Sequence, residues 1–440
     1  MNVTEYAFRK TAIHLLRSGK SPVEVTQELG RSLAWVYKWQ KRFFAEQDWQ
    51  ALNDQPHAPK HCPKKLPEAV RWAIREARSE LEAEASEPGK LSYMGAYAVQ
   101  ARLRKKKTSS LPGITSIERE LRAAKMTRPR KASEAPEILY PRLQPKQPLE
   151  LIQVDIVPHY LPGGPCVSCF NAIDVVSHYP TGQPSLTKRS EDAVNFLLHV
   201  WREIGIPEFT QVDNEGCFSG GFTHPGVLGK VLRLALLVGT QLVFSPIRHP
   251  ESNGTIERFH QDYSKNVWDK IELPDFQAVQ QHSPAFFDAY RHSEHHSALM
   301  GHCPADLHPA RLTCSLPEGF CLPGRLPLTV GQVHFIRRVS SDGKVRILNL
   351  DWEVPLAQPD QGVWAALEFT FQGAMLRIFD AAPDAREQTC LAKHSFPLKE
   401  EVQPLAEMFQ RLVPLQEHSL FRSAVDLAVD RFFSLISTML

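Results

Sequence analysis

The first fifty residues carry apolar positions at helical spacing, interrupted by glycines. Phe8, Ala12 and Leu15 lie three or four positions apart and predict a first helix. SPVEVTQEL and SLAWVYKWQKRFFAEQ predict two further helices, each with a serine at the capping position and with a short turn at Gly30 between them. Two helices joined by such a turn are typical of a helix-turn-helix, so we assign residues 1–50 to a helix-turn-helix domain.

The third predicted helix has one apolar and one basic face. Its basic and aromatic polar positions are Arg31, Tyr37, Lys38, Lys41 and Arg42. A recognition helix has this character because one face packs in the domain while the other meets phosphates and base edges. We therefore predict that these five side chains bind DNA. A plain helical hairpin with a solvated basic face is the alternative.

A second run of helical periodicity follows a linker that contains several prolines. LPEAVRWAIREARSELEAEA, GAYAVQARLRKKK and TSIERELRAAKM are amphipathic, and Ser116 is positioned to cap the last segment. We assign residues 66–131 to a second helical DNA-binding unit and the proline-rich residues 132–148 to an extended linker. The basic run 104–107 fits either phosphate contact or a solvated patch.

The pattern changes at Leu149 from helical periodicity to short apolar runs. LELIQVDIV and VSCFNAIDVV predict strands, and a third strand is expected near Tyr179. Helical segments then alternate with the strands FTQVDN and TQLVFSP, and the last helix is SNGTIERFHQDYSKNVWDKI. Strands followed by alternating helix and strand predict a mixed α/β domain over residues 149–272.

The remaining third of the chain changes character twice. Residues 273–325 predict an irregular, mostly helical connector. VGQVHFIRRV, KVRILNL, VWAALEFTF and AMLRIFD are short half-alternating strands, with a hairpin turn expected at Asp342-Gly343. These strands predict a small β-barrel over 326–400. Apolar spacing after it predicts a helical tail over 401–440.

Composition is ordinary for a soluble globular protein, but charge is unevenly distributed. Hydrophobic residues make up 42% of the chain and charged residues 23%. Residues 1–131 hold 26 Lys and Arg against 14 Asp and Glu, whereas residues 132–440 hold 25 against 35. A basic front joined to an acidic body indicates that the front meets a polyanion.

The eight cysteines and the polar first ten residues bear on location. The cysteines are irregularly spaced, no apolar signal segment precedes them, and no apolar run reaches the roughly 18 residues that span a bilayer. We therefore expect reduced thiols, no membrane association, and a cytoplasmic, nucleoid-associated protein.

Three acids stand out by their position in the predicted elements. Asp155 lies within the apolar strand IQVDIV, Asp213 ends the strand FTQVD, and Glu257 lies in the first turns of the last α/β helix. Such positions can converge at one edge of a mixed sheet. Because buried carboxylates repel one another, divalent cations would stabilise them, and oxygen ligands suit Mg²⁺ or Mn²⁺. A bulge aspartate and a helix-capping glutamate are the alternative reading.

These residues lie in motifs that resemble a known family. IQVDIV, AIDVVSHYPTG, GIPEFTQVDNEG and FSPIRHPESNGTIERFHQ, in this order, resemble the catalytic core of the DDE family, which comprises retroviral-type integrases and related insertion-sequence transposases. RHSEHHSALMGHCPAD resembles the segment that follows this core, and the β-strands after Val330 resemble a small C-terminal β-domain. The resemblance assigns the catalytic and metal-binding acids to Asp155, Asp213 and Glu257 rather than Glu251.

The resemblance implies a multidomain fold: an α-helical helix-turn-helix N-terminal region, an α/β RNase H-like catalytic core and a small C-terminal β-barrel. It implies a DNA transposase or integrase, a polynucleotidyl transferase that performs metal-dependent 3′-end cleavage and strand transfer of a mobile element. The cofactor would be Mg²⁺ or Mn²⁺, two ions per site. The partners would be double-stranded DNA, both element ends and target, and other copies of the chain in a homo-oligomer.

DNA contact is also expected near Glu257. Asn253 lies in the turn before it, and Gln261 and Lys265 lie four and eight residues after it, on the same helical stripe. We predict that these three side chains bind DNA. For Lys265, a solvated position on an exposed helix face is the alternative.

The sequence departs from the family pattern in two places, and it is compatible with two other functions. Asp213 and Glu257 enclose 43 residues, more than is usual in the family, and the loop after Asp213 reads DNEG. Neither departure removes a carboxylate. A catalytically inactive DNA-binding protein descended from a transposase is one alternative, and an RNase H-like nuclease is the other.

Other residues that could suggest chemistry are interpreted as structural. Asp174 is read as a structural or supporting acid. Cys166 and Cys169 form a single CxxC without a second pair at zinc spacing, and the histidines between 292 and 302 have no supporting acid or cysteine. We therefore predict no structural zinc.

Overall fold

The computed structural model describes residues 3–54, 66–108, 110–127, 139–220, 225–247, 250–294, 296–309, 315–316, 319–405 and 409. The chain divides into two compact units, Met1–Leu66 and Pro67–Leu440, each of which is described by itself. The predicted tail helix over 401–440 lies almost entirely outside the described residues.

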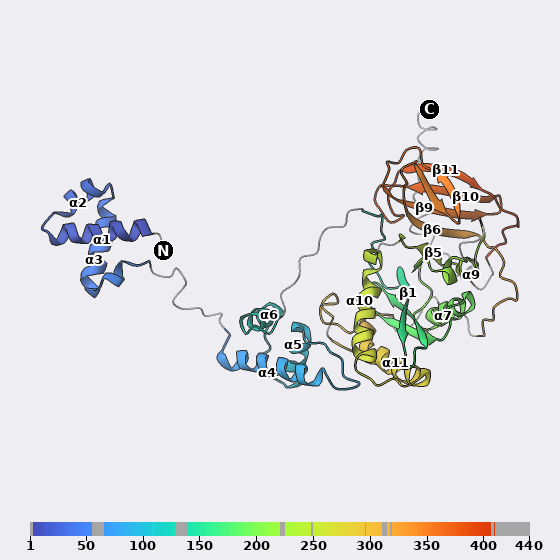
Figure 1. The fold of residues 1–440 in the computed structure, drawn as a ribbon, viewed down its shortest axis with the longest axis horizontal. Coiled ribbons are helices and arrows are strands. Elements are labelled where there is room, and N and C mark those ends of the chain that lie inside the picture. Colours follow the sequence, from blue (N-terminus) through green and yellow to red (C-terminus); the bar gives the residue numbers. More distant parts are fainter. Residues whose placement is uncertain are drawn as a thin grey trace, which may run out of the picture. The chain divides into compact units, whose positions relative to one another are not determined.

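The first unit is a small bundle of helices (Figure 1). It comprises α1 (Val3–Arg17), α2 (Pro22–Leu29), α3 (Leu33–Glu46) and the short η1 (Trp49–Leu52). The predicted start of α2 is confirmed: Ser21 and Glu24 cap one another's backbone N–H groups, and Gly30 ends the helix in the left-handed conformation. Ser32 accepts a hydrogen bond from the Trp35 N–H at 3.3 Å and so begins α3.

The second unit begins with three helices, α4 (Glu68–Glu84), α5 (Ala96–Lys105) and α6 (Ile114–Ala123). Buried apolar residues recur along each helix, which is why the predicted amphipathic segments fold against one another. The predicted capping role of Ser116 is wrong, because α6 starts two residues earlier and Gly113 occupies the N-cap.

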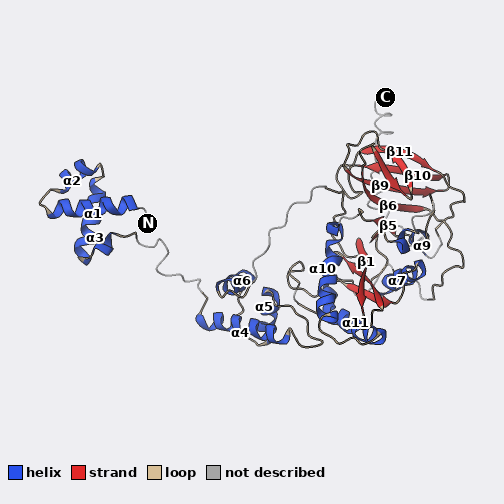
Figure 2. Cartoon of the chain, viewed as in Figure 1, coloured by secondary structure: helices blue, strands red, loops and turns tan. Residues whose placement is uncertain are grey.

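A nine-stranded mixed sheet forms the body of the second unit (Figure 2). Its first five strands are β1 (Leu151–Tyr160), β2 (Cys166–Asp174), β3 (Pro180–Ser185), β4 (Phe209–Val212) and β5 (Gln241–Phe244). They lie in the order β3-β2-β1-β4-β5, with β1, β2 and β3 antiparallel and with β4 and β5 parallel to β1. This is the RNase H-like arrangement that the sequence predicts.

Helices cover both faces of this part of the sheet. They are α7 (Ser190–Glu203), α8 (Gly216–Ser219), α9 (Lys230–Val238), η2 (Pro250–Asn253), α10 (Gly254–Tyr263), η3 (Ser264–Trp268), α11 (Phe276–Arg291) and α12 (Pro304–Leu307). Ile152 and Val154 of β1 pack in one core with α7 and α9, whereas Cys169 and Ile173 of β2 pack in another with α10 and α11. One face of the sheet therefore belongs to α7 and α9, and the other to α10 and α11 (Figure 1).

The C-terminal strands extend the same sheet instead of forming a separate module. They are β6 (Gly331–Arg338), β9 (Gly362–Thr370), β10 (Gly373–Phe379) and β11 (Cys390–Phe396). β6 pairs parallel to β5, with Phe244 opposite Phe335, and β9, β10 and β11 follow in order. The predicted separate β-barrel is not confirmed. The physical reason is that β5 would otherwise present an unpaired edge, and β6 supplies its hydrogen bonds.

The predicted turn between the first two C-terminal strands forms, but those strands do not pair. Gly343 adopts a left-handed φ of 73°, whereas β6 pairs with β9. β7 (Lys344–Ile347) pairs instead with β8 (Leu350–Glu353). Leu348 and Asn349 connect these strands with φ angles of 50° and 59°, as a tight hairpin of this hand requires. No helix within the described ranges is both long enough and apolar enough to cross a bilayer.

Candidate active site

The register of β1 and β4 brings two of the predicted acids to one level of the sheet. The two strands are parallel neighbours, and Gln153 lies opposite Gln211. Asp155 and Asp213 each follow two residues later, so both point to the same face as their glutamines. That face is the one that α10 covers. Adjacent parallel strands thus bring together two carboxylates that are separated by more than fifty residues of sequence.

The surroundings of both aspartates raise the pKa of their carboxyl groups. Burial, together with the charges of Glu215 and Glu257, raises the pKa of Asp155 to about 6, against a hydrogen bond from the Ile156 N–H that lowers it. Burial likewise raises the pKa of Asp213 to about 7, with Asp155 and Glu215 adding to the shift. The repulsion between the carboxylates indicates that they share one electrostatic environment.

The third predicted acid enters from α10. Glu257 lies in the first turn of this helix, is half-buried, and adds to the raised pKa of Asp155. Acidic residues are favoured in a first helical turn, so the helix tolerates Glu257 there whatever its role. The structure therefore places the predicted Glu257 within electrostatic reach of Asp155, which in turn acts on Asp213.

Two glutamines that the sequence analysis did not single out set the start of α10. Gln153 accepts a hydrogen bond from the Ile256 N–H at 3.2 Å and donates to the Ser252 carbonyl at 3.1 Å. Gln211 donates to the same carbonyl at 3.2 Å and to the Asn253 side chain at 2.6 Å. Because each glutamine lies two residues before an aspartate, the strands that carry the two aspartates also fix the turn that leads to Glu257.

Asn253, which the sequence analysis predicts to contact DNA, lies buried in this structure, and its contact with DNA stays a prediction. Its side chain is 8% exposed and accepts hydrogen bonds from Gln211 and, at 2.9 Å, from the Ser245 hydroxyl. The amide oxygen is thus engaged inside the protein. A polar residue in a turn is a poor guide to DNA contact because the same residue types also bind neighbouring backbone and side chains.

A fourth carboxylate and one lysine lie at the rim of the site. The Glu215 N–H donates to Asp213 Oδ1 at 3.0 Å, and the Glu215 carboxylate pairs with Lys188 Nζ at 2.9 Å. Lys188 lowers the pKa of Asp213, while Glu215 raises it. The DNEG departure from the family pattern was the available signal for Glu215. Nothing in the sequence pattern pointed to Lys188.

One histidine touches the site without balancing its charge. His260 Nδ1 lies 3.7 Å from Asp155 Oδ2. Burial lowers the pKa of His260 to about 4, so the ring is neutral at neutral pH and the contact is not an ion pair.

The carboxylate oxygens of the site are of the kind that a hard divalent cation prefers, but their side chains are not gathered around one point. Carboxylate oxygens are the ligands that Mg²⁺ and Mn²⁺ prefer, and a cation would relieve the repulsion that raises both aspartate pKa values. Over the described ranges, however, no three His, Cys, Asp or Glu side chains lie close enough together to hold an ion.

The helical stripe predicted beyond Glu257 is altered by a change of helix type. Gln261 remains exposed on α10, and Arg258 donates to its side-chain oxygen at 3.4 Å. The helix widens into a π-helical turn at η3, so Lys265 departs from the four-residue spacing of the α-helix. Lys265 is exposed, and its ammonium group donates to the Ser92 carbonyl at 3.4 Å. Its contact with DNA stays a prediction.

The predicted recognition residues of α3 fall into two groups. Tyr37 is 51% exposed, and Lys38 and Lys41 are also exposed. Arg31 instead pairs with Glu5, and the Arg42 guanidinium lies 5.1 Å from the Trp39 ring. Tyr37, Lys38 and Lys41 therefore point outward as predicted for DNA contact, whereas Arg31 is engaged by an acid of α1.

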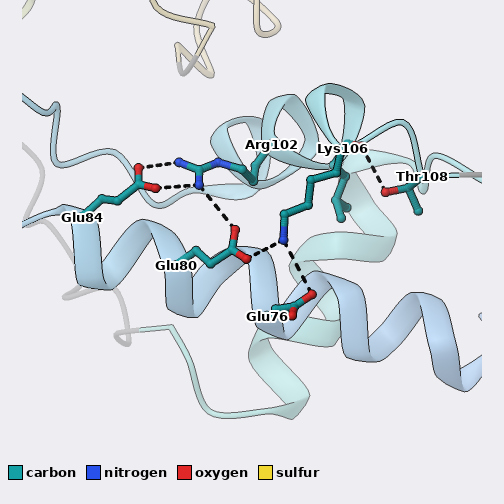
Figure 3. A network of polar contacts seen from close by, with 7 residues as sticks. Glu76, Glu80, Glu84, Arg102, Lys106 and Thr108 are labelled. Carbon is teal, nitrogen blue, oxygen red and sulfur yellow. Dashed lines mark hydrogen bonds and ion pairs between the residues drawn. The ribbon is translucent and has the colours of Figure 1, made fainter.

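The basic run on α5 is partly neutralised by acids of α4 (Figure 3). Lys106 Nζ lies 2.5 Å from Glu80, and Arg102 binds both oxygens of Glu84 at 2.5 and 2.7 Å. Arg104 pairs with Glu294 at 2.6 Å. Of the two possibilities left open for the basic run, phosphate contact or a solvated patch, neither includes these ion pairs, which engage Arg104 and Lys106 within the protein.

The residues interpreted as structural lie in structural surroundings. Asp174 is fully buried and accepts hydrogen bonds from the Leu149 and Ser177 N–H groups at 2.7 Å. It therefore fixes the turn between β2 and β3. Cys166 and Cys169 are free thiols.

Comparisons with known proteins bear on the family. Residues 238–304 match the family model described as integrase core domain. A search of curated proteins finds no match. The match to the family model includes Glu257 and the segment that follows α10, whereas both aspartates lie outside it.

Several solved structures are similar to the chain. One is the HTLV-2 integrase catalytic core domain in complex with magnesium in its trimeric form, at 14% identity and a TM-score of 0.30, covering 37% of this chain and 98% of that chain. Another is the simian T-cell lymphotropic virus intasome in complex with PP2A regulatory subunit B56 gamma, at 16% identity and a TM-score of 0.32, covering 68% of this chain and 96% of that chain. A third is the catalytic core domain of BIV integrase, at 15% identity and a TM-score of 0.28, covering 36% of this chain and 93% of that chain. The resemblance to the DDE integrase and transposase family that the motifs predict is confirmed by the match of residues 238–304 to the integrase core domain model.

Proposed function

We propose that this chain is a DNA transposase or integrase that cleaves the 3′ ends of a mobile element and joins them to target DNA. Asp155, Asp213 and Glu257 are its catalytic residues and hold Mg²⁺ or Mn²⁺, two ions per site. The observation that carries the proposal is the electrostatic coupling of the three carboxylates: besides burial, Glu257 raises the pKa of Asp155, and Asp155 raises the pKa of Asp213.

The chemistry of phosphodiester cleavage explains why such a site is useful. Bound divalent ions activate a water or a 3′-hydroxyl and stabilise the leaving oxygen. The residues of the chain supply oxygen ligands, and the glutamines behind them keep β1, β4 and the start of α10 in register. Cleavage and joining are the same displacement with different nucleophiles, so one site serves both steps.

The first unit recognises the element ends in this proposal. Tyr37, Lys38 and Lys41 are exposed on the third helix of a helix-turn-helix, where side chains reach a major groove. Double-stranded DNA, both element end and target, is the partner, and the protein acts as a homo-oligomer on it. We expect the protein at the nucleoid.

The test is an in vitro reaction with the full-length protein, Mg²⁺, and a DNA fragment that carries the sequences flanking its coding region. The expected products are a nicked 3′ end and its covalent joining to a target plasmid. Asp213→Asn is the matched inactive control. Cleavage without joining would favour the nuclease alternative. Binding without either reaction would favour an inactive DNA-binding relative.

A further inference from the structure

We propose that Arg337, on C-terminal strand β6, is a positioning residue for the active site and acts on Asp213 through the side chain of Asn214. The inference rests on the proposed function for its catalytic consequence. The geometry that carries it is independent of that function. It makes the C-terminal extension of the sheet a part of the active site rather than an appended DNA-binding module.

Arg337 is a buried cation whose partners are all neutral. Its side chain is 8% exposed, and no carboxylate within the described part of the chain forms an ion pair with it. Burying a guanidinium without an anion is costly unless every donor is used. A guanidinium buried in this way therefore depends on hydrogen bonds to neutral partners.

Four hydrogen bonds aim this guanidinium at the loop after β4. Arg337 donates to Asn214 Oδ1 at 2.9 Å and to the Ser245 carbonyl at 3.2 Å. Its remaining donors reach the Ile336 and Arg346 carbonyls at 2.8 and 3.2 Å. The planar fork thus spans β5, β6, β7 and the Asn214 loop at once, which a lysine ammonium cannot reproduce.

Asn214 transmits this constraint to the catalytic acid next to it. Its Nδ2 donates to the Ser245 carbonyl at 2.6 Å, so its amide is held from both ends. The following N–H, that of Glu215, donates to Asp213 Oδ1 at 3.0 Å. The turn that orients the Asp213 carboxylate is therefore fixed on its outer side by Arg337. This is a role typical of groups that orient metal-binding residues without touching the ion.

The registers of the sheet explain why β6 can provide this residue. Val212 lies opposite Phe244, and Phe244 lies opposite Phe335. Arg337 therefore follows two residues beyond the level at which β4 ends. The parallel pairing of β6 onto β5 brings it beside the loop that follows Asp213.

The neighbouring Arg338 provides a matched control. It lies on the same strand, is exposed, and pairs with Asp360 at 2.5 Å. Full-length Arg337→Met, Arg337→Lys, Asn214→Ala, the Arg337→Met/Asn214→Ala double variant and Arg338→Met would be compared. Three readouts apply: amide hydrogen exchange of residues 213–216, the Mg²⁺ concentration for half-maximal thermal stabilisation, and cleavage of the DNA fragment described above.

We expect Arg337→Met to speed exchange in 213–216 and to raise the half-maximal Mg²⁺ concentration about 10- to 100-fold. Asn214→Ala should match it, and the double variant should add little further. Arg338→Met should behave as wild type. Arg337→Lys, which keeps the charge, tests the fork should Arg337→Met fail to fold, and is expected to show the same defect.

Unchanged exchange and Mg²⁺ response in Arg337→Lys and Asn214→Ala would overturn the proposal, as would strictly additive effects in the double variant. Failure of the proposed function is distinguishable. A wild-type protein that neither responds to Mg²⁺ nor cleaves DNA would remove the catalytic reading. The exchange of residues 213–216 would still decide whether Arg337 holds the loop.

Discussion

The carboxylate site and the contact between helices α4 and α5 differ in whether their acidic side chains are paired with basic ones. Between the helices, each acid meets a base: Glu84 binds Arg102 through both oxygens, which lowers the pKa of Glu84 and raises that of Arg102. At the site, Asp155 and Asp213 face each other and other acids, and the pKa of both is raised. One arrangement is complete within the chain. The other leaves both aspartates with a raised pKa, although Lys188 lowers that of Asp213.

The presence or absence of a basic partner distinguishes the acids of α4 from those of the carboxylate site better than residue type does. Both regions contain acids on regular elements, and the acidic run of α4 is the denser of the two. At the site, the neutral amides Gln153, Gln211 and Asn214 fix the surrounding turns, and Lys188 pairs with Glu215 at the rim. Amides fix geometry without cancelling the charge that a cation would meet.

The largest expected effect comes from removing a charge at the site. Asp155→Asn, Asp213→Asn or Glu257→Gln should each reduce cleavage and joining by about 10³-fold or more, because a metal-held reaction loses its cation. DNA binding by the first unit should be nearly unchanged. The measurement is product formation beside a gel-shift titration. Near wild-type joining by any of the three would remove that residue from the site.

A second effect should follow from removing a neutral support. Gln211→Ala deletes the amide that holds Asn253 and Ser252, so the start of α10 and Glu257 lose their register with β4. We expect cleavage to fall about 10- to 100-fold, since small misplacements of catalytic groups are costly. Gln372→Ala, on an exposed turn, is the matched control. Equal activity of the two variants would contradict the role of Gln211.

A buried neutral group should respond to acid differently from either region. His334 accepts a hydrogen bond from Trp364 and donates to Gln241, and burial lowers its pKa from 6.5 to about 3. A lowered histidine pKa means that this stabilisation is complete above pH 6.5 and is lost as the pH falls towards 3. At pH 5 the loss is roughly 2 kcal/mol. The melting temperature of His334→Gln should therefore fall less between pH 7.5 and 5 than that of wild type. Parallel losses would contradict the assignment.

The smallest effect should come from the compensated region. Arg102→Met removes a half-exposed bidentate pair from the α4–α5 contact and should cost about 1 kcal/mol of stability. The loss should shrink at high salt because the pair is near solvent. Lys105→Met, on the same helix, is the control. Urea melts at two salt concentrations provide the measurement. A salt-independent loss would indicate packing of the side-chain stem rather than the charge.

The sequence predicted the elements of the core well because their signals are local. Ser21 with Glu24 and the alternation of apolar runs define helix starts and strands without reference to the rest of the chain. The three acids were singled out by their positions at strand ends and a helix start, and the family resemblance chose Glu257 over Glu251; their catalytic role stays a prediction. What the pattern could not provide is the registry of Gln153 with Gln211, which depends on which strands become neighbours.

The errors share the same origin. Nothing in the sequence indicated that Asn253 is buried, because its partner Gln211 lies 42 residues away in sequence. The C-terminal strands looked like a separate barrel because short alternating strands do not reveal which edge they will join. Leu348 has a positive φ that few leucines adopt, so the β7–β8 hairpin had no turn signature. Each miss depends on a non-local partner or a rare backbone conformation.

The contrast between a compensated and an uncompensated region is tested most directly by melting at pH 8 with and without Mg²⁺. In the absence of the ion, wild type should be no more stable than Asp213→Asn, because an ionised Asp213 is destabilising above its pKa of about 7. Mg²⁺ should then raise the melting temperature of wild type by several degrees and leave that of Asp213→Asn nearly unchanged. An equal response of both proteins, or none in wild type, would contradict the proposal that these carboxylates are arranged for a cation.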